Sequence, residues 1–428
     1  MSVTIVDKPR DFSLSRAKLI YSCTSTNTAQ ANFKFVVTVL RDATQLCKFY
    51  IDPNPADSLI FDLSEAIRGE LSIDVEDSRG DIVHNMPHNF FEAQTVATNG
   101  ADVFTVNFAE YYGTTPTEQT TSATHTLQVQ NGITKINEGL HVDLFDYGAD
   151  NITRKAFLTD VERIDGANIT LYASDNDYGT LSFVNADSTY LSATQRNIVY
   201  GIYDDDGDYS NPLGSATIAI NSSNGSEVPT SATGNEKLVH FGAFPANVNN
   251  GNHPVLNAKP SQFPNWKYIR YFFTNVGGNR CSAYLIIKRR YDSCKHTPVR
   301  LAWENSLGGW DYFTMDGRKK PSVSVERKSY RQSIGNYSAA TYSLNTWDRG
   351  KTNYHVETSE LYEVNSGKIN TYDSDLLKNC LTSRTVMAYI ESQWLPVTIE
   401  NNTVRYETEP ISKLQEITFN ITIAQKPC

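Results

Sequence analysis

Three clusters of aspartate are the best candidates for chemistry in this sequence, because carboxylate oxygens are the ligands that calcium prefers. Their spacing does not fit an EF-hand loop: with Gly207 at position six, position one would be Ile202 and position twelve Leu213. Aspartate and asparagine near glycine are also the ordinary residues of hairpin turns. We therefore favour turns over calcium sites for Asp143-Leu-Phe-Asp146-Tyr-Gly-Ala-Asp150, Asp175-Asn-Asp177-Tyr-Gly and Asp204-Asp-Asp-Gly207-Asp208.

The motifs of known catalytic centres are absent from the sequence. It has no Gly-x-Ser-x-Gly elbow, no P-loop, no Rossmann fingerprint and no His-Glu-x-x-His. Pro87 separates His84 from His88, which argues against a helical metal-binding pair. None of the six cysteines forms Cys-x-x-Cys, so we expect reduced thiols and no zinc. We predict no catalytic residue, metal or cofactor. A glycoside hydrolase needs only two opposed carboxylates, so a polysaccharide depolymerase stays an alternative.

Size, charge and composition indicate a multidomain β protein. The chain has 428 residues, enough for two or three domains, and many Tyr, Phe, Thr, Ser and Asn residues, which favour strands and turns. Its net charge of −10 disfavours a groove-reading nucleic-acid binder, which needs a basic face. Basic residues cluster only briefly, at 288–290 and 318–320. We find no apolar run of signal-peptide or transmembrane length, so no membrane insertion is expected.

The most informative segment runs from Leu301 to Lys320, and we call it the anchor stretch. Apolar and polar residues alternate before and after a Gly-Gly pair, which predicts two strands joined by a turn. Two interpretations are open: a buried aromatic corner inside one domain, or a contact surface between subunits. The candidate interface residues, which include a tryptophan further along the chain, are Trp303, Leu307, Gly308, Gly309, Trp310, Tyr312 and Trp394.

Residues 301–313 resemble the motif Leu-Ala-Trp-Leu-Asn-Ser-Leu-Gly-Gly-Trp-Asp-Tyr-Phe of virion proteins from tailed bacteriophages, especially phages of Bacteroidetes and related marine phages. Glu304 replaces the usual leucine, which suggests a position facing solvent or a partner. Residues 156–160 and 180–184 are similar to the second sheet of that family. The resemblance implies an immunoglobulin-like sandwich at the N-terminus and a tail-tube-like β domain at the C-terminus.

Local patterns predict where the main elements lie. Alternation predicts a hairpin from 32–40 and 45–51, and a strand at 103–108 followed by a turn at 109–113 and a polar loop at 114–124. Ser64 is expected to cap a short helix that ends near Leu71. The C-terminal section should contain a hairpin around Gly277-Gly278, a helix from about Asp373 to Ser383, and strands at 362–364, 386–390, 394–399 and 417–423.

We therefore expect a mainly β protein of several β-sandwich domains with one short C-terminal helix. The predicted domains are residues 1–132, 133–250 and 251–428. The resemblance implies a structural component of a phage particle, made in the host bacterial cytoplasm, that forms a ring or adaptor in the tail, neck or baseplate. Its partners would be copies of itself and other tail or neck proteins, without sequence-specific nucleic-acid binding. The alternative is a receptor- or carbohydrate-binding fibre or decoration protein that recognises a host-surface glycan.

Overall fold

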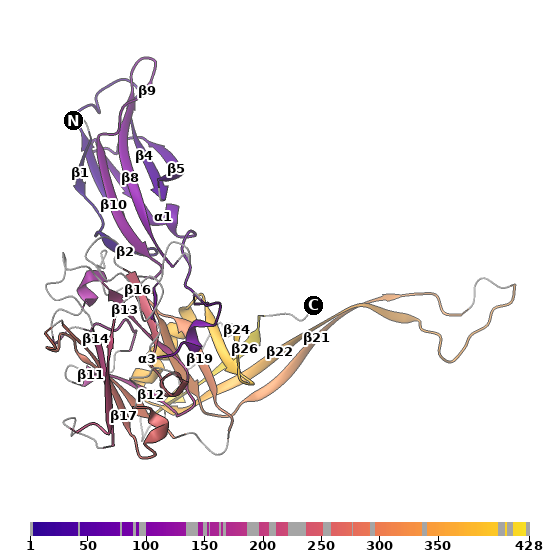
Figure 1. Cartoon of the computed structure of the whole chain (residues 1–428). Coiled ribbons are helices and arrows are strands. Elements are labelled where there is room, and N and C mark those ends of the chain that lie inside the picture. Colours follow the sequence, from indigo (N-terminus) through magenta and orange to yellow (C-terminus); the bar gives the residue numbers. More distant parts are fainter. Residues whose placement is uncertain are drawn as a thin grey trace. The chain divides into compact units, whose positions relative to one another are not determined.

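A computed structural model of the chain shows a mainly β protein, as the composition predicts (Figure 1). The residues it describes are 3–41, 43–77, 79–88, 91–93, 100–133, 144–148, 152–153, 155–161, 164–165, 168–185, 197–204, 211–220, 237–250, 258–275, 277–291, 296–335, 340–400, 407–408 and 414–424. Among them, no helix is long and apolar enough to cross a membrane. Two of the three aspartate clusters, at 143–150 and 204–208, lie partly outside these residues.

The first 130 residues supply two sheets that form a β-sandwich. One sheet has the order β1-β3-β6, and the other has the order β2-β10-β8-β4-β5, with β9 paired to β8. The predicted hairpin is confirmed, since β4 and β5 pair antiparallel. The strands are β1 (Val3–Asp7), β2 (Phe12–Leu14), β3 (Ile20–Ser25), β4 (Lys34–Arg41), β5 (Thr44–Ile51), β6 (Ser58–Asp62), β8 (Ala101–Tyr112), β9 (Thr117–Glu118) and β10 (Ala123–Gln130).

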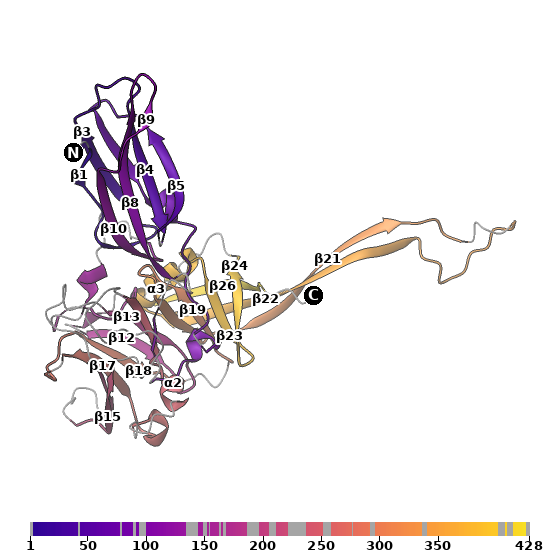
Figure 2. The ribbon, with the colours of Figure 1, turned by 45° about the horizontal axis from the view of Figure 1, so that its top comes forward.

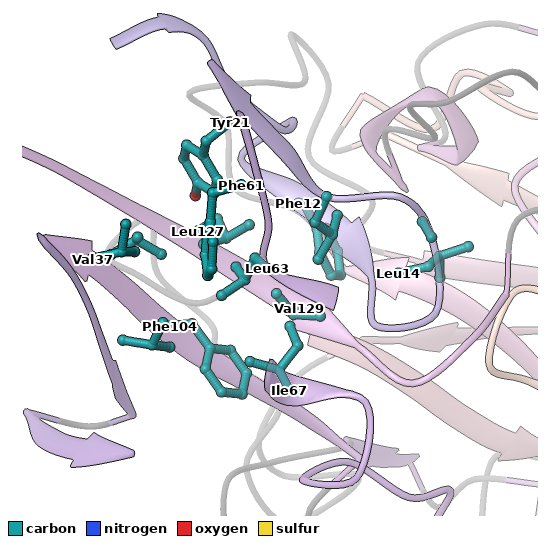
Figure 3. Close-up of a cluster of buried hydrophobic side chains, with 14 of the residues drawn as sticks. Phe12, Leu14, Tyr21, Val37, Phe61, Leu63, Ile67, Phe104, Leu127 and Val129 are labelled. Carbon is teal, nitrogen blue, oxygen red and sulfur yellow. The ribbon is translucent and has the colours of Figure 1, made fainter. Parts of the chain in front are cut away.

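Inward-facing side chains of both sheets fill this sandwich. Tyr21 and Phe61 come from one sheet, and Val37, Phe104 and Leu127 come from the other (Figure 3). All five are buried, at 8% exposure or less, and period-two alternation is the reason that each strand delivers them to the same face. The expected sandwich at the N-terminus is therefore present.

A second pair of sheets follows. One has the order β11-β12-β18-β17-β14-β15, and the other β13-β16-β7. The predicted hairpin around Gly277-Gly278 is confirmed, because β17 and β18 pair antiparallel. The predicted domain boundary at residue 250 is wrong, since β17 also pairs with β14 and β18 with β12. The strands are β7 (Phe91–Ala93), β11 (Ile164–Asp165), β12 (Asn168–Ala173), β13 (Thr180–Asn185), β14 (Asn197–Tyr203), β15 (Gly214–Ala219), β16 (Lys237–Gly242), β17 (Tyr268–Thr274) and β18 (Tyr284–Arg289).

The last sheet has the order β20-β19-β23-β24-β26-β22-β21, with β25 paired to β26. The predicted strands before and after the Gly-Gly pair are confirmed as β19 and β20, which are neighbours in this sheet. The strands are β19 (Val299–Glu304), β20 (Trp310–Met315), β21 (Lys320–Arg331), β22 (Lys351–Ile369), β23 (Val386–Ile390), β24 (Gln393–Ile399), β25 (Glu407–Thr408) and β26 (Gln415–Ile423).

Contacts divide the chain into two compact units, which we describe separately. Unit 1 comprises Met1–Asp292, Ala302–Phe313 and Asp375–Thr385, and unit 2 comprises Ser293–Leu301, Thr314–Ser374 and Val386–Cys428. Unit 1 therefore contains the first two pairs of sheets together with most of the anchor stretch. Among the described cysteines, Cys23, Cys47 and Cys380 are free thiols, as expected.

The described helices are short. They are α1 (Ser64–Ile67), α2 (Pro245–Asn250) and α3 (Thr371–Thr382), with 3₁₀ turns at Val83–Asn85, Leu144–Tyr147 and Pro260–Gln262. Helix α3 confirms the predicted C-terminal helix, although Asn370 caps it by accepting the backbone N–H of Asp373 at 3.0 Å. The predicted cap of α1 is wrong: Ser64 lies inside the helix, and its hydroxyl donates to Asp62 instead.

Two strand assignments in the polar parts of the sequence also need correction. The predicted turn at 109–113 is still strand, since β8 continues to Tyr112, and the expected loop at 114–124 contains β9 and the first residues of β10. The largest omission is β21, together with the long outer part of β22. These strands carry Ser, Thr, Glu and Lys on both faces, so they lack the apolar alternation from which a strand is predicted.

Candidate functional site

Within the anchor stretch, the turn between β19 and β20 is organised by one asparagine and one glycine. The side-chain oxygen of Asn305 accepts the backbone N–H groups of Leu307 at 3.1 Å and Gly309 at 2.8 Å. Gly308 has φ +80, a conformation that L side chains rarely adopt. A Cβ at this position would lie 2.0 Å from the carbonyl oxygen of Asn131. The turn therefore requires glycine at 308 both for its conformation and for its close packing.

The seven predicted interface residues are all buried within the single chain. Trp303 has no exposed surface, Trp310 is 1% exposed, and even Tyr312 and Trp394 are only 8% exposed. A contact surface between subunits needs accessible side chains, so the contact-surface interpretation is wrong for the chain in this conformation. The buried aromatic corner, the other interpretation, describes the residues of the anchor stretch, whereas Trp394 lies in unit 2, where its ring packs against Tyr389.

The aromatic rings of the corner pack around a buried histidine that sequence reasoning did not single out as a partner. The ring of Trp310 meets His84 edge-on, with ring centres 4.5 Å apart, and its Nε1 donates to the Asp74 carbonyl at 3.3 Å. The Tyr312 hydroxyl lies 2.8 Å from Nδ1 of His84 and 2.8 Å from the hydroxyl of Thr180. His84 thus serves the aromatic packing. The described residues contain no group of three or more side chains that could hold a metal.

Glu304 does not face solvent, which corrects the expectation drawn from its replacing leucine. It is 5% exposed, forms an ion pair with Arg16, and accepts from the side-chain amide of Asn131 at 3.0 Å. Burial raises the pKa of Glu304, and the positive charges of Arg16 and Arg384 oppose that rise. A buried charge is tolerated when it is paired and hydrogen-bonded, so the replacement of leucine by glutamate is matched by Arg16.

A pair of buried aspartates joins the anchor stretch to residues 156–160. Asp311 accepts the Thr159 hydroxyl at 2.5 Å and the backbone N–H of Asp160 at 2.8 Å. Asp160 in turn accepts the backbone N–H of Ser306 at 2.8 Å and its hydroxyl at 2.5 Å. Burial and the neighbouring Asp160 raise the pKa of Asp311 to about 7. Each of the four carboxylate oxygens already accepts a hydrogen bond from the protein, so the pair works as a brace between two segments.

The stretches that carry the phage resemblance therefore meet in space. Besides the aspartate brace, the Asn305 side chain donates to Leu158 O at 3.1 Å, and Leu158 N donates to Ser182 O at 2.8 Å. Residues 130–133, at the end of the first sandwich, join through Gln130 Nε2 to Leu307 O at 2.7 Å and Ile133 N to Ser306 O at 2.8 Å. We call this assembly the polar joint. It ties four separated stretches of unit 1 together.

The second candidate region is the hairpin that follows the anchor stretch. β22 pairs with β26 only from Leu361 onward, whereas its earlier residues pair with β21. We call Val323–Glu360 the arm, and it is a two-stranded ribbon as far as the pair of Arg331 and Lys351. Figures 1 and 2 both show it continuing well past the end of β26. A two-stranded ribbon is only marginally stable in water by itself.

The arm exposes both of its faces. Val323 and Val356 are 63% and 52% exposed, and Trp347, in the segment beyond the paired strands, is 76% exposed. Two aromatic residues, Tyr330 and Tyr354, lie with ring centres 6.3 Å apart and are both largely exposed. Monomeric proteins rarely leave many large apolar residues exposed on one element, and such groupings mark interaction sites. The exposed large apolar residues of the arm are Val323, Tyr330, Ile334, Tyr342, Leu344, Trp347, Tyr354 and Val356.

Comparisons with known proteins add little beyond the geometry. No protein-family model matches the chain, and no curated protein matches it. Among solved structures, it is similar to a chain in the crystal structure of Dpr2 Ig1-Ig2 in complex with DIP-Theta Ig1-Ig3, with 7% identity and a TM-score of 0.14. The match covers 68% of this chain and 100% of that chain. A likeness this weak carries no argument about function.

Proposed function

We propose that this protein is a structural component of a tailed-phage particle, which assembles as a ring or adaptor in the tail, neck or baseplate. The observation that carries the proposal is the arm: a long ribbon, exposed on both faces, has little use in a protein that works alone. The resemblance of residues 301–313 to phage virion proteins supports the same conclusion and is the reason that we name a phage particle as the assembly. The polar joint would keep unit 1 rigid while the arm makes contacts outside the chain.

Mass spectrometry of purified phage particles, combined with immunogold labelling, tests this proposal. We expect the protein in intact particles, in a constant ratio to the other tail or neck proteins, with label at one position along the particle axis. Absence of the protein from purified particles, together with its recovery as a free species in the lysate, would contradict it. Negative-stain images of the purified protein give a second measurement, in which rings or ring fragments are expected.

The alternative, a receptor- or carbohydrate-binding fibre or decoration protein, is favoured by the exposed aromatic residues of the arm. Trp347, Tyr342 and Tyr354 are each more than 60% exposed, and sugars stack on aromatic faces. A glycan array, read with and without calcium, separates the two functions. Binding that is lost in Trp347→Ala would favour the receptor function, and an array without signal would favour assembly.

A further inference from the structure

The outer part of the arm is basic, in contrast to the rest of the chain. This part, Arg327–Val356, contains five basic residues and one acid, Asp348. The chain as a whole has a net charge of −10, so the residues outside this part carry −14. The excess of acids is large in residues 1–132, with sixteen acidic and nine basic residues. The outer arm and the rest of the chain are thus of opposite charge.

Several cations of the outer arm have no acidic partner among the described residues. Lys328 lies 4.0 Å from Glu326, but no ion pair is formed by Arg327, Arg331, Arg349 or Lys351 with any residue that the structure describes. Arg331 and Lys351 stand directly opposite each other in the ribbon, where like charges repel. An acidic surface laid against the arm would relieve this repulsion.

Apolar residues accompany these charges. Val323, Val325 and Val356 lie on one face of the ribbon, since Val356 pairs opposite Arg327 and strand residues two apart share a face. Val323 and Val356 are both more than half exposed. In addition, both edges of the ribbon offer backbone N–H and C=O groups for pairing with another strand. Valines and open edges fit a protein partner better than they fit a nucleic acid, because a phosphate backbone satisfies neither.

We infer that the arm of one copy of this chain binds the acidic surface of a second copy, as the contact that links neighbouring copies in an assembly. The inference rests on the proposed function, since it names the partner of the arm in that assembly. An arm that reaches to a neighbour makes the same contact repeat from copy to copy, and a head-to-tail contact of this kind closes into a ring when its rotation allows. The attraction between opposite charges is screened by salt, so association is expected to weaken at high ionic strength.

Sedimentation velocity of the full chain and three variants tests the inference. In the first variant, residues 323–360 are replaced by Asn-Gly between Ser322 and Leu361, which stand opposite each other in the ribbon. The second variant carries Arg331→Glu and Lys351→Glu. The control carries Lys267→Glu and Lys378→Glu, the same charge change at two exposed residues outside both the arm and residues 1–132. Thermal melts report whether each variant folds.

We expect the full chain to self-associate at low salt, the shortened chain to stay monomeric, and the charge reversal to weaken association about tenfold or more. The control should change it less than about twofold, because exposed charges far from a contact contribute little. If the shortened chain fails to fold, the charge-reversal variant carries the test, since its substitutions lie on exposed residues.

Three results would overturn the inference. Association that is unchanged in the shortened or charge-reversed chain would show that the arm is not the contact. A full chain that stays monomeric at every concentration would exclude a second copy as the partner. Binding of a 30-nucleotide DNA that is lost on charge reversal, with self-association unaffected, would assign the arm to nucleic acid. None of these results depends on whether the protein is found in phage particles, which is the separate test of the proposed function.

Discussion

The anchor stretch and the arm each contain two strands and large apolar residues, yet Trp303 and Trp310 are buried while Val323, Trp347 and Tyr354 are exposed. In the anchor stretch, Asn305 and Asp311 bind the backbone of residues 158 and 160. The side chains of Gln130 and Asp160 bind the backbone of the anchor stretch in return. In the paired part of the arm, β21 and β22 are hydrogen-bonded to each other. The difference shows that strand pairing alone does not bury apolar residues: the buried stretch is the one that is hydrogen-bonded to distant segments of the chain.

Gly308 should show the largest effect in the anchor stretch. Gly308→Ala places a Cβ against the Asn131 carbonyl, so we expect the free energy of unfolding to fall by more than about 5 kcal/mol, or the chain to fail to fold. Gly278→Ala is the matched control: its φ is +78, and no atom lies within 4 Å of the added Cβ. That variant should lose only about 1–2 kcal/mol. If denaturant melts show equal losses in the free energy of unfolding for the two variants, the close packing against Asn131 contributes nothing beyond the backbone conformation.

The tryptophans of the two regions give the most direct contrast. Trp310→Ala should lower the free energy of unfolding by about 4 kcal/mol, because it removes a buried ring and leaves a cavity. Trp347→Ala, at an exposed position, should change it by less than about 0.5 kcal/mol. Urea titrations of both variants at a concentration where the protein is monomeric measure the difference. A large loss from Trp347→Ala would mean that the arm folds back onto its own chain.

Burial of Asp311 in the anchor stretch should make the free energy of unfolding depend on pH. The pKa of Asp311 is about 7 in the fold against an ordinary value of 3.8, so the folded protein binds more protons than the unfolded chain between these values. The contribution is complete below about pH 4 and is lost as the pH rises through 7. Asp311→Asn should therefore flatten the stability profile over this range, by up to about 4 kcal/mol.

Asp57→Asn, the same substitution on an exposed turn, is the control for the pH measurement. Thermal melts between pH 4 and pH 8 provide the comparison. An Asp311→Asn profile as steep as that of the unsubstituted chain would show that the aspartate brace does not hold a proton in the folded state.

The smallest expected loss in the anchor stretch is that of the buried ion pair. Glu304→Gln leaves the Arg16 charge without a carboxylate and should cost about 3 kcal/mol. Glu65→Gln breaks an exposed ion pair with Arg68 and should cost less than about 0.5 kcal/mol. Combining Arg16→Met with Glu304→Leu should recover most of the loss, because both charges are then absent. No recovery in the double variant would mean that Asn131, and not Arg16, holds Glu304.

Local signals in the sequence were sufficient for the elements with strong patterns. The hairpin of β4 and β5, the hairpin of β17 and β18, helix α3 and the Gly-Gly turn were all predicted, since each depends on residues a few positions apart. The same reasoning missed β10 and β21. Both are rich in threonine, serine or charged residues, and the pairing that makes them strands comes from partners elsewhere in the chain.

By itself, the sequence determined that the chain is mainly β and where its strongest strands and turns lie. It also determined that the Gly308-Gly309 pair forms a turn. Only the tertiary structure decided that Glu304 meets Arg16, that Asp311 meets Asp160, and that the aromatic corner is closed to solvent while the arm is open. The physical reason is that a strand or turn with a strong local pattern follows from the residues of one segment. Burial and ion pairing instead depend on which distant segments the folded chain brings together.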